Sequence, residues 1–290
     1  MKCPLLLLLG TGAMLGLNFP VGKIALAHGV NPALWAAIIS LGAGLAMLFV
    51  STRSQTGTAI PNTIFKFSIV SGILSYVMPN LLTFLVIPKI GSGLAAVMFA
   101  LSPVVTAILS IVLGVRPPNR WGIAGIACGL LGVLVIVLGR NASLEIEATM
   151  WVIVALFIPV FLGFGNVYRT AAWPAGASPH LLAAYTNLAA VPFLLAIATF
   201  LGFELGPLVQ IPWLISVQIL ISTTMFLMFF RLQQIGGPTY LSQIGYVAAA
   251  VSLIIGVTVL GEVYPAMVWL GAGVVAAGIA VSTWGAMQKS

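Results

Sequence analysis

The second half of this 290-residue chain repeats the hydrophobic outline of the first half at an offset of 147 residues. The clearest copy pairs residues 28–37 with residues 175–184, and the residues that recur in register are Gly29, Pro32, Leu34, Ala36 and Ala37. Each half holds enough apolar segments for about five membrane-spanning helices of roughly 20 residues. Because an odd number of spans makes the second copy enter the membrane from the opposite side, the duplication predicts an inverted repeat.

The composition is that of a membrane protein, because 61% of the residues are hydrophobic and only 5% are charged. Ten spans of roughly 20 residues occupy about 200 residues. This leaves short connections and no room for a soluble catalytic or nucleic-acid-binding domain. The formal charge of +7 is therefore interpreted as a topology signal, and membrane lipid rather than nucleic acid is the expected surrounding.

We predict an all-α integral membrane protein with ten transmembrane helices, arranged as two inverted five-helix repeats. The first repeat is expected at residues 1–140, a linker at 141–148 and the second repeat at 149–290. Apolar runs that end at turn-rich segments place the helices, from first to tenth, at residues 4–27, 33–51, 63–86, 91–113, 120–139, 149–170, 180–201, 212–233, 238–260 and 265–286.

The distribution of charges predicts the orientation of this array. On the side that holds the N-terminus fall Lys2, Arg53, Lys66, Arg116, Arg120, Arg169, Arg231 and Lys289. The other side receives Lys23, Lys89 and Arg140, together with all the acidic residues: Glu145, Glu147, Glu204 and Glu262. Since Lys and Arg gather in short cytoplasmic connections, both termini are expected in the cytoplasm and the chain in the inner, or plasma, membrane.

Several short motifs resemble those of EamA-type members of the drug/metabolite transporter superfamily. The segment Gly16-Leu-Asn18-Phe-Pro20-Val-Gly-Lys23, followed by Asn31-Pro32, is similar to the opening motif of this family. Leu101-Ser-Pro103 resembles its mid-helix Leu-x-Pro, and Leu260-Gly261-Glu262 matches the Leu-Gly-Glu that closes its ninth helix. Glycines seven residues apart recur in the fifth and tenth helices, at Gly122 and Gly129 and at Gly271 and Gly278. The resemblance covers the whole chain.

This resemblance implies a transporter of small organic solutes, and export of amino acids or related metabolites is the activity that it favours. Leu15 and Ser40 stand where the family often carries Trp and Arg, so the resemblance fixes no particular substrate. Aromatic and Met side chains along the presumed cavity favour aromatic or bulky apolar solutes, although aromatic residues also form interfacial belts. The alternatives are a passive channel-like facilitator and a membrane scaffold that transports nothing.

Polar side chains at membrane depth are the candidate substrate-binding residues, because they usually face the bundle interior or a wet cavity. Asn18 and Asn166 occupy roughly corresponding places in the first and sixth helices, near opposite membrane faces. They are interpreted as paired gates or cavity ends, or else as amides that hydrogen-bond a neighbouring helix.

The third helix carries Tyr76 and Asn80 four residues apart, hence on one helical face, with Pro79 between them. Proline removes a backbone donor and frees a carbonyl, so this face suits a binding wall, or else a kinked helix with Tyr76 in a packing role. The other candidates at mid-depth are Ser102, Met225, Gln243 and Tyr246.

Cations near the ends of predicted helices need an interpretation, because they could bind a substrate or mark the membrane interface. Lys23 could meet a substrate carboxylate, or its side chain could extend to the membrane interface. Arg169 and Arg231 stand at helix ends on the predicted cytoplasmic side, where we interpret them as topology anchors.

The fifth and tenth helices are rich in glycine and poor in polar groups at depth. Small residues let helices approach closely, so we interpret these helices as packing elements or as contacts of a homodimer. The sequence lacks Asp and the common hydrolase, metalloprotease and nucleotide-binding motifs, so neither an enzyme nor a cofactor or metal site is expected. Inverted repeats are typical of secondary transporters that work by alternating access.

Overall fold

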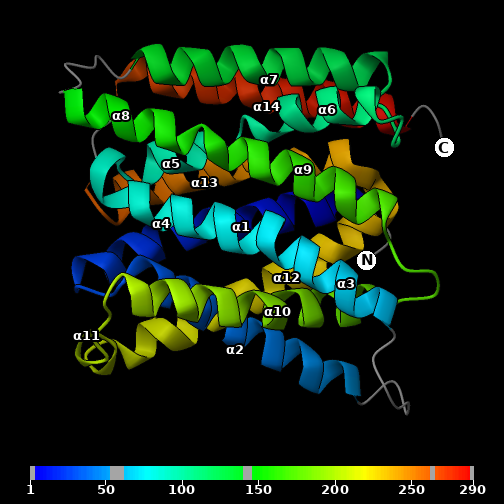
Figure 1. Cartoon of the computed structure of the whole chain (residues 1–290). Coiled ribbons are helices and arrows are strands. Elements are labelled where there is room, and N and C mark those ends of the chain that lie inside the picture. Colours follow the sequence, from blue (N-terminus) through cyan, green and yellow to red (C-terminus); the bar gives the residue numbers. More distant parts are fainter. Residues whose placement is uncertain (1–3, 53–61, 140–145, 262–264, 288–290) are drawn as a thin grey trace.

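The structure is a computed structural model that describes residues 4–52, 62–139, 146–261 and 265–287. Residues used above that lie outside this part are Lys2, Arg53, Arg140, Glu145, Glu262 and Lys289. The described elements are all helices (Figure 1): α1 (Pro4–Ala27), α2 (Pro32–Thr52), α3 (Asn62–Gly72), the π-helix η1 (Ile73–Val77), α4 (Met78–Ile90), α5 (Ser92–Phe99), α6 (Ser102–Val112), α7 (Arg120–Gly139), α8 (Ile146–Ala155), α9 (Phe157–Ala171), α10 (Pro179–Phe200), α11 (Gly206–Val209), α12 (Pro212–Ser242), α13 (Ile244–Thr258) and α14 (Ala266–Met287).

The helices follow the segments predicted from hydropathy, and α1 and α7 match their predicted bounds at both ends. Within the described residues, seven helical stretches are long and apolar enough to cross a membrane, and three shorter apolar stretches lie in α7, α13 and α14. The predicted helix 238–260 differs, because its first residues belong to α12. The chain turns at Gly237, whose φ is 71°, so residues 238–242 lie beyond a kink in α12.

The backbone carries the same internal repeat as the sequence. In each half, glycines with positive φ stand in the turns between helices. Other residues rarely adopt this conformation. Three pairs of such glycines stand 147, 146 and 147 residues apart: Gly29 and Gly176, Gly91 and Gly237, and Gly114 and Gly261. The duplicated sequence therefore makes the same turns twice, at equivalent places between helices.

The two repeats interlock instead of lying as separate domains. In the first repeat α1 packs against α12 and α13, and in the second repeat α9, the equivalent of α1, packs against α4 and α6. Gly16 of α1 and Gly163 of α9, 147 residues apart, make these approaches possible. A Cβ on Gly16 would lie 2.7 Å from the Val251 side chain, and one on Gly163 would lie 2.7 Å from that of Val105. Equivalent glycines thus serve equivalent contacts across the repeats.

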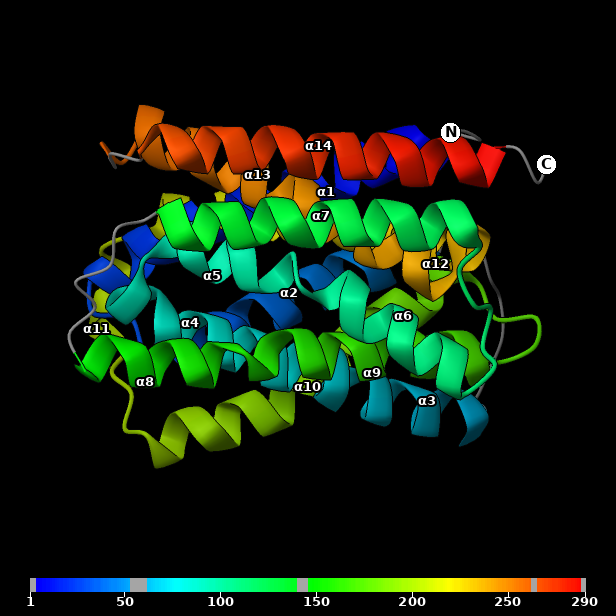
Figure 2. The same cartoon turned by 90° about the horizontal axis from the view of Figure 1, so that it is seen from above.

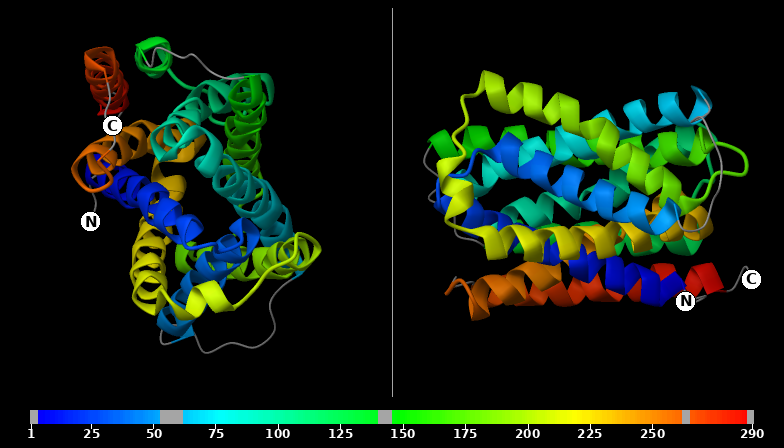
Figure 3. Two further views of the ribbon diagram at one scale, coloured as in Figure 1. Left: turned by 90° about the vertical axis from the view of Figure 1, so that its left-hand side faces the viewer. Right: turned by 90° about the horizontal axis from the view of Figure 1, so that it is seen from below.

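Helices α7 and α14 form a pair at one edge of the bundle (Figures 1 and 2). The end-on view in Figure 3 shows this pair set apart from the other helices. Gly132 faces the backbone of Gly271 and Val275, and Gly278 faces that of Gly125 and Gly129. Small residues here permit close packing within one chain, and the homodimer through these helices stays a prediction.

Both the beginning of α1 and the end of α14 lie at the same end of the bundle, at the right of Figure 1. We call this the termini end, and the other the opposite end. Helices α9 and α12 run toward the termini end, whereas α1 runs away from it.

Candidate functional site

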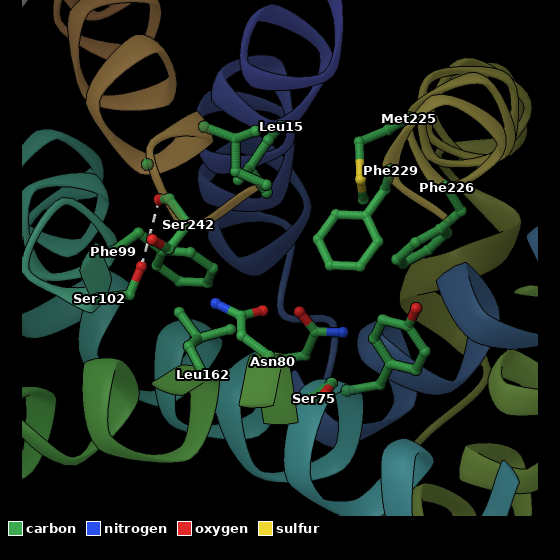
Figure 4. Close-up of a pocket in the computed structure, with 14 residues that line it drawn as sticks. Leu15, Ser75, Asn80, Phe99, Ser102, Leu162, Met225, Phe226, Phe229 and Ser242 are labelled. Atoms are coloured by element: carbon green, nitrogen blue, oxygen red, sulfur yellow. Dashed lines mark hydrogen bonds between the residues drawn. The ribbon is translucent and has the colours of Figure 1, made fainter. Parts of the chain in front are cut away.

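A cavity lies at the centre of the bundle, between the two repeats (Figure 4). Its walls come from helices of both halves of the chain. The lining residues are Leu15, Ser75, Tyr76, Asn80, Phe99, Ser102, Leu162, Asn166, Met225, Phe226, Phe229, Ser242, Ile244 and Gly245. Aromatic and aliphatic side chains dominate this wall, and a few polar groups converge within it, which is the usual character of a small-molecule site.

One wall forms where two interrupted helices cross. Pro103 has no N–H for the carbonyl of Phe99, and the chain breaks there, between the end of α5 and the beginning of α6. Gly245, at the beginning of α13, packs on that carbonyl: a Cβ on it would lie 2.5 Å from the Phe99 oxygen. Ser102 Oγ donates to the Ser242 carbonyl over 3.4 Å, as the dashed line in Figure 4 shows. The fourth spans of the two repeats therefore meet at the cavity.

The facing wall is the π-helix η1 with the first turn of α4. Pro79 cannot donate to the carbonyl four residues earlier, and the chain widens into a π-turn over Ile73–Val77 just before it. π-Turns of this kind are frequent at functional sites. Ser75, Tyr76 and Asn80 all line the cavity from this irregular stretch, and Figure 4 shows Asn80 extending toward the space below Phe229.

A second, smaller cavity continues the first toward the opposite end. It shares Asn80, Phe99 and Met225 with the central cavity, along with Leu15 and Phe226, and it adds Asn18, Thr83 and Ser222. Together the two cavities follow the long axis of the bundle. Asn80 and Met225 lie where they join.

A polar cluster lies at the opposite end of this path, and we call it the Asn18 cluster: Asn18, Gln218 and Ser222. Gln218 Nε2 donates to Asn18 Oδ1 and, over 2.9 Å, to Ser222 Oγ. Ser222 Oγ donates to the same Asn18 oxygen over 3.0 Å. The cluster is neutral and joins α1 to α12 across the repeats.

A second cluster lies toward the termini end, and we call it the Arg169 cluster: Ser75, Asn166, Arg169 and Gln233. The Arg169 side chain is 0% exposed. Its Nη2 donates to Asn166 Oδ1 over 2.6 Å, its Nη1 to Ser75 Oγ, and its Nε to Gln233 Oε1 over 3.3 Å. The guanidinium also lies 4.8 Å from the centre of the Phe229 ring. The interpretation of Arg169 as a topology anchor is therefore wrong, because its side chain turns inward from α9 and is buried against α12 and η1.

The role of Arg231 as a topology anchor stays a prediction. Arg231 is exposed on α12 and donates from Nη1 to Gln234 Oε1 over 2.7 Å. The two arginines differ because Arg169 points inward between helices and Arg231 points outward.

Six of the nine predicted site residues line the two cavities: Asn18, Tyr76, Asn80, Ser102, Asn166 and Met225. The structure places the other three elsewhere. Tyr246 points toward α7, where its hydroxyl donates to the Ile126 carbonyl over 3.4 Å. Lys23 and Gln243 do not line either cavity. Whether any of these residues binds a solute stays a prediction.

Sequence reasoning missed the partners of the predicted residues. Ser75, Gln218 and Gln233 were not selected, although each is polar and lies within a helical stretch long and apolar enough to cross a membrane. A signal for the Arg169 cluster was present: Asn166 and Arg169 stand three residues apart and so share a helical face. That spacing could have indicated that Arg169 turns toward the same interior as Asn166.

Comparisons with known proteins agree with this architecture. The model of the EamA-like transporter family matches residues 3–138 and again residues 149–284. A solved structure titled "Crystal structure of protein" is similar over 96% of this chain and 97% of that chain, with 19% sequence identity and a TM-score of 0.71. At that identity the likeness shows the fold alone. Among curated proteins, none matches this chain. The predicted all-α membrane fold with two repeats is confirmed.

Proposed function

This chain belongs to the EamA-like transporter family, and from that premise we propose that it is a secondary transporter that exports small organic solutes by alternating access. Amino acids, aromatic ones included, or related metabolites are the proposed substrates. The proposed location is the inner membrane, with both termini in the cytoplasm.

One observation carries this proposal: a central cavity is lined by equivalent, interrupted helices from both repeats. In inverted-repeat transporters the substrate site lies near the midplane where the repeats meet, on helices broken at that depth. Ser102 and Ser242 stand at the two breaks, and the Asn18 and Arg169 clusters lie toward the two ends. Such an arrangement supports a site that opens first toward one side and then toward the other.

The chemistry of the wall supports small solutes with an apolar body. Phe226 lies against Tyr76 with ring centres 4.8 Å apart, and Phe99, Met225 and Phe229 extend the apolar surface. The polar groups of Ser75, Asn80 and Asn166 lie among these side chains. An aromatic or branched aliphatic solute with one polar end would satisfy both kinds of surface.

The charges of the described residues support the proposed orientation. Lys66, Arg116, Arg120 and Arg231 lie near the termini end, whereas Lys23 and Lys89 lie toward the opposite end. Glu204 follows α10 at that opposite end. A basic termini end is the one expected to face the cytoplasm.

Counterflow in proteoliposomes tests the proposal. Vesicles that contain the purified protein are loaded with pools of unlabelled amino acids, organic acids or amines, and uptake of a labelled member of each pool is followed. A carrier gives saturable uptake that an internal pool accelerates, whereas protein-free vesicles give none. Uptake that is proportional to concentration and indifferent to the internal pool would instead favour the channel-like facilitator.

A further inference from the structure

Arg169 is a buried cation whose partners are all neutral. Its N–H groups donate to Ser75, Asn166 and Gln233, and its face lies against the Phe229 ring. An ionised side chain inside a membrane protein is costly, and one that is retained usually pairs with an opposite charge or serves a substrate path. Dipoles of hydroxyl and amide groups solvate the guanidinium here without neutralising it.

The chain offers few candidates for a counter-charge. The sequence contains four acidic residues, Glu145, Glu147, Glu204 and Glu262. Glu204 is the one whose side chain the structure describes, and it is exposed at the opposite end of the bundle. Among the described side chains no acid pairs with Arg169, so its positive charge behind the cavity wall is available to a partner that comes from outside the chain.

The cluster also turns hydrogen-bond donors toward the cavity. Ser75 Oγ accepts from Arg169, which leaves the Ser75 hydroxyl hydrogen for another acceptor. Asn166 Oδ1 is likewise occupied by Arg169, so the Asn166 amide is left with its N–H groups, one of which donates to Thr106 Oγ1 over 3.2 Å. The buried Tyr76 hydroxyl has no hydrogen-bond partner among the described residues, although Tyr76 lines the same cavity. Donors polarised by a nearby cation are suited to an anion.

The fold itself does not require this charge. The position equivalent to Arg169 in the first repeat is Gly22, 147 residues earlier, and a Cβ there would lie 2.5 Å from the Phe84 ring. The corresponding Asn18 cluster is held by neutral hydrogen bonds alone. The two equivalent ends thus differ in their buried charge: Arg169 is fully buried, whereas Lys23, the cation next to Gly22, is half-buried and lines neither cavity.

We infer that the termini end of the cavity, formed by Ser75, Tyr76, Asn166 and the Arg169 guanidinium behind them, is an anion site that selects organic monocarboxylates with an aromatic or aliphatic body. The carboxylate lies at this end and the apolar body lies against Phe99, Met225 and Phe226. A monocarboxylate balances the single cation, whereas a zwitterion brings an ammonium group for which the wall offers only neutral partners. The inference rests on the proposed carrier function, and among the proposed substrates it favours related monocarboxylic metabolites over the amino acids themselves.

The test uses three probes with the same phenyl body and different charge: 3-phenylpropionate, phenylalanine and phenethylamine. Each competes against a labelled solute that supports counterflow in the wild-type protein, and each is also added to the detergent-purified protein to measure the shift in unfolding temperature. We expect 3-phenylpropionate to compete at a concentration at least tenfold lower than phenylalanine, and phenethylamine to compete least. The unfolding temperature should rise in the same order.

The matched variants are Arg169→Gln, Arg169→Lys and Arg231→Gln. In Arg169→Gln, the concentration of 3-phenylpropionate that halves uptake of the labelled solute should rise at least tenfold. The corresponding concentration of phenethylamine should stay the same or fall. Arg169→Lys keeps the charge and should keep the preference for the anion. Arg231→Gln removes an exposed charge from the neighbouring helix and should change nothing.

Two results would overturn the inference while the proposed function stands: counterflow in which the wild-type protein prefers phenylalanine or phenethylamine, or an anion preference that Arg169→Gln leaves intact. The charge order in the wild-type protein decides the matter even if Arg169→Gln does not fold. Absence of counterflow with every pool is a different outcome, because it refutes the proposed carrier itself.

Discussion

Gly245→Ala should destabilise the protein, although the same change usually stabilises a helix. The added Cβ would lie 2.5 Å from the Phe99 oxygen, 2.8 Å from its carbonyl carbon and 3.1 Å from the Ala100 nitrogen. All three are backbone atoms, so no side chain can rotate away. Ordinary contact begins at 3.4 Å, so α13 and α5 must separate by the difference between 2.5 and 3.4 Å, which is 0.9 Å.

The size of the effect follows from two opposing contributions. Overpacking a well-packed contact costs about 1–3 kcal/mol, whereas replacing Gly by Ala inside a helix gains about 0.5–1 kcal/mol. The net loss for Gly245→Ala therefore lies between about 0 and 2.5 kcal/mol, and the contact of 2.5 Å with a backbone oxygen favours the upper half of that range. Gly273→Ala is the matched control, because nothing lies within 4 Å of its Cβ position. That control should gain about 0.5–1 kcal/mol.

The assay is thermal unfolding of both variants and the wild-type protein in the same detergent, followed by tryptophan fluorescence. Gly245→Ala should unfold below the wild-type protein and Gly273→Ala at or above it. If Gly245→Ala were as stable as Gly273→Ala, the close crossing of α5 and α13 would be wrong, and so would the wall that it builds.

Two further substitutions separate packing from binding. Gly132→Leu places a large side chain against the backbone of Gly271 and Val275, so it should lower the stability of the α7–α14 pair by about 1–3 kcal/mol. The solute concentration that half-saturates counterflow should not change, because neither helix lines the cavity. Tyr76→Phe removes a buried hydroxyl without a partner among the described residues, so the stability measured by thermal unfolding should increase by about 1 kcal/mol. The solute concentration that half-saturates counterflow should rise about five- to tenfold, because the hydroxyl would no longer donate to the solute. An unchanged half-saturating concentration in Tyr76→Phe would place the solute away from η1.

Hydropathy and turn residues were sufficient to predict the membrane fold. Apolar runs placed α1 and α7 at their observed bounds, and the recurrence of Gly29 at Gly176 predicted the duplication that the backbone also carries. These features are local or periodic, so a single sequence contains them. The predicted break between the helices at 212–233 and 238–260 is confirmed by the kink at Gly237, whose backbone is not helical.

The site was predictable only in part, because membrane depth and helix face are separate properties. Depth follows from position in an apolar run, and it led to Asn18, Asn80 and Asn166. The direction in which a side chain points depends on which helix packs where, and that depends on contacts between repeats. Tyr246 therefore turned out to face α7, and Arg169, three residues from Asn166, turned out to be buried instead of reaching the interface.

Thiol labelling of a Cys at Ser102 tests the central claim, which is that solute binds in the cavity between the repeats and reaches it from both sides in alternation. In a background with Ser at positions 3 and 128, Ser102→Cys is a nearly isosteric reporter on the wall, and Ser252→Cys on α13 is a fully buried control outside the cavity lining. The account predicts that a membrane-impermeant thiol reagent modifies Ser102→Cys from either face of sealed vesicles. A solute active in counterflow should slow both reactions, and Ser252→Cys should stay unmodified. Modification from one face only, or rates that the solute leaves unchanged, would contradict it.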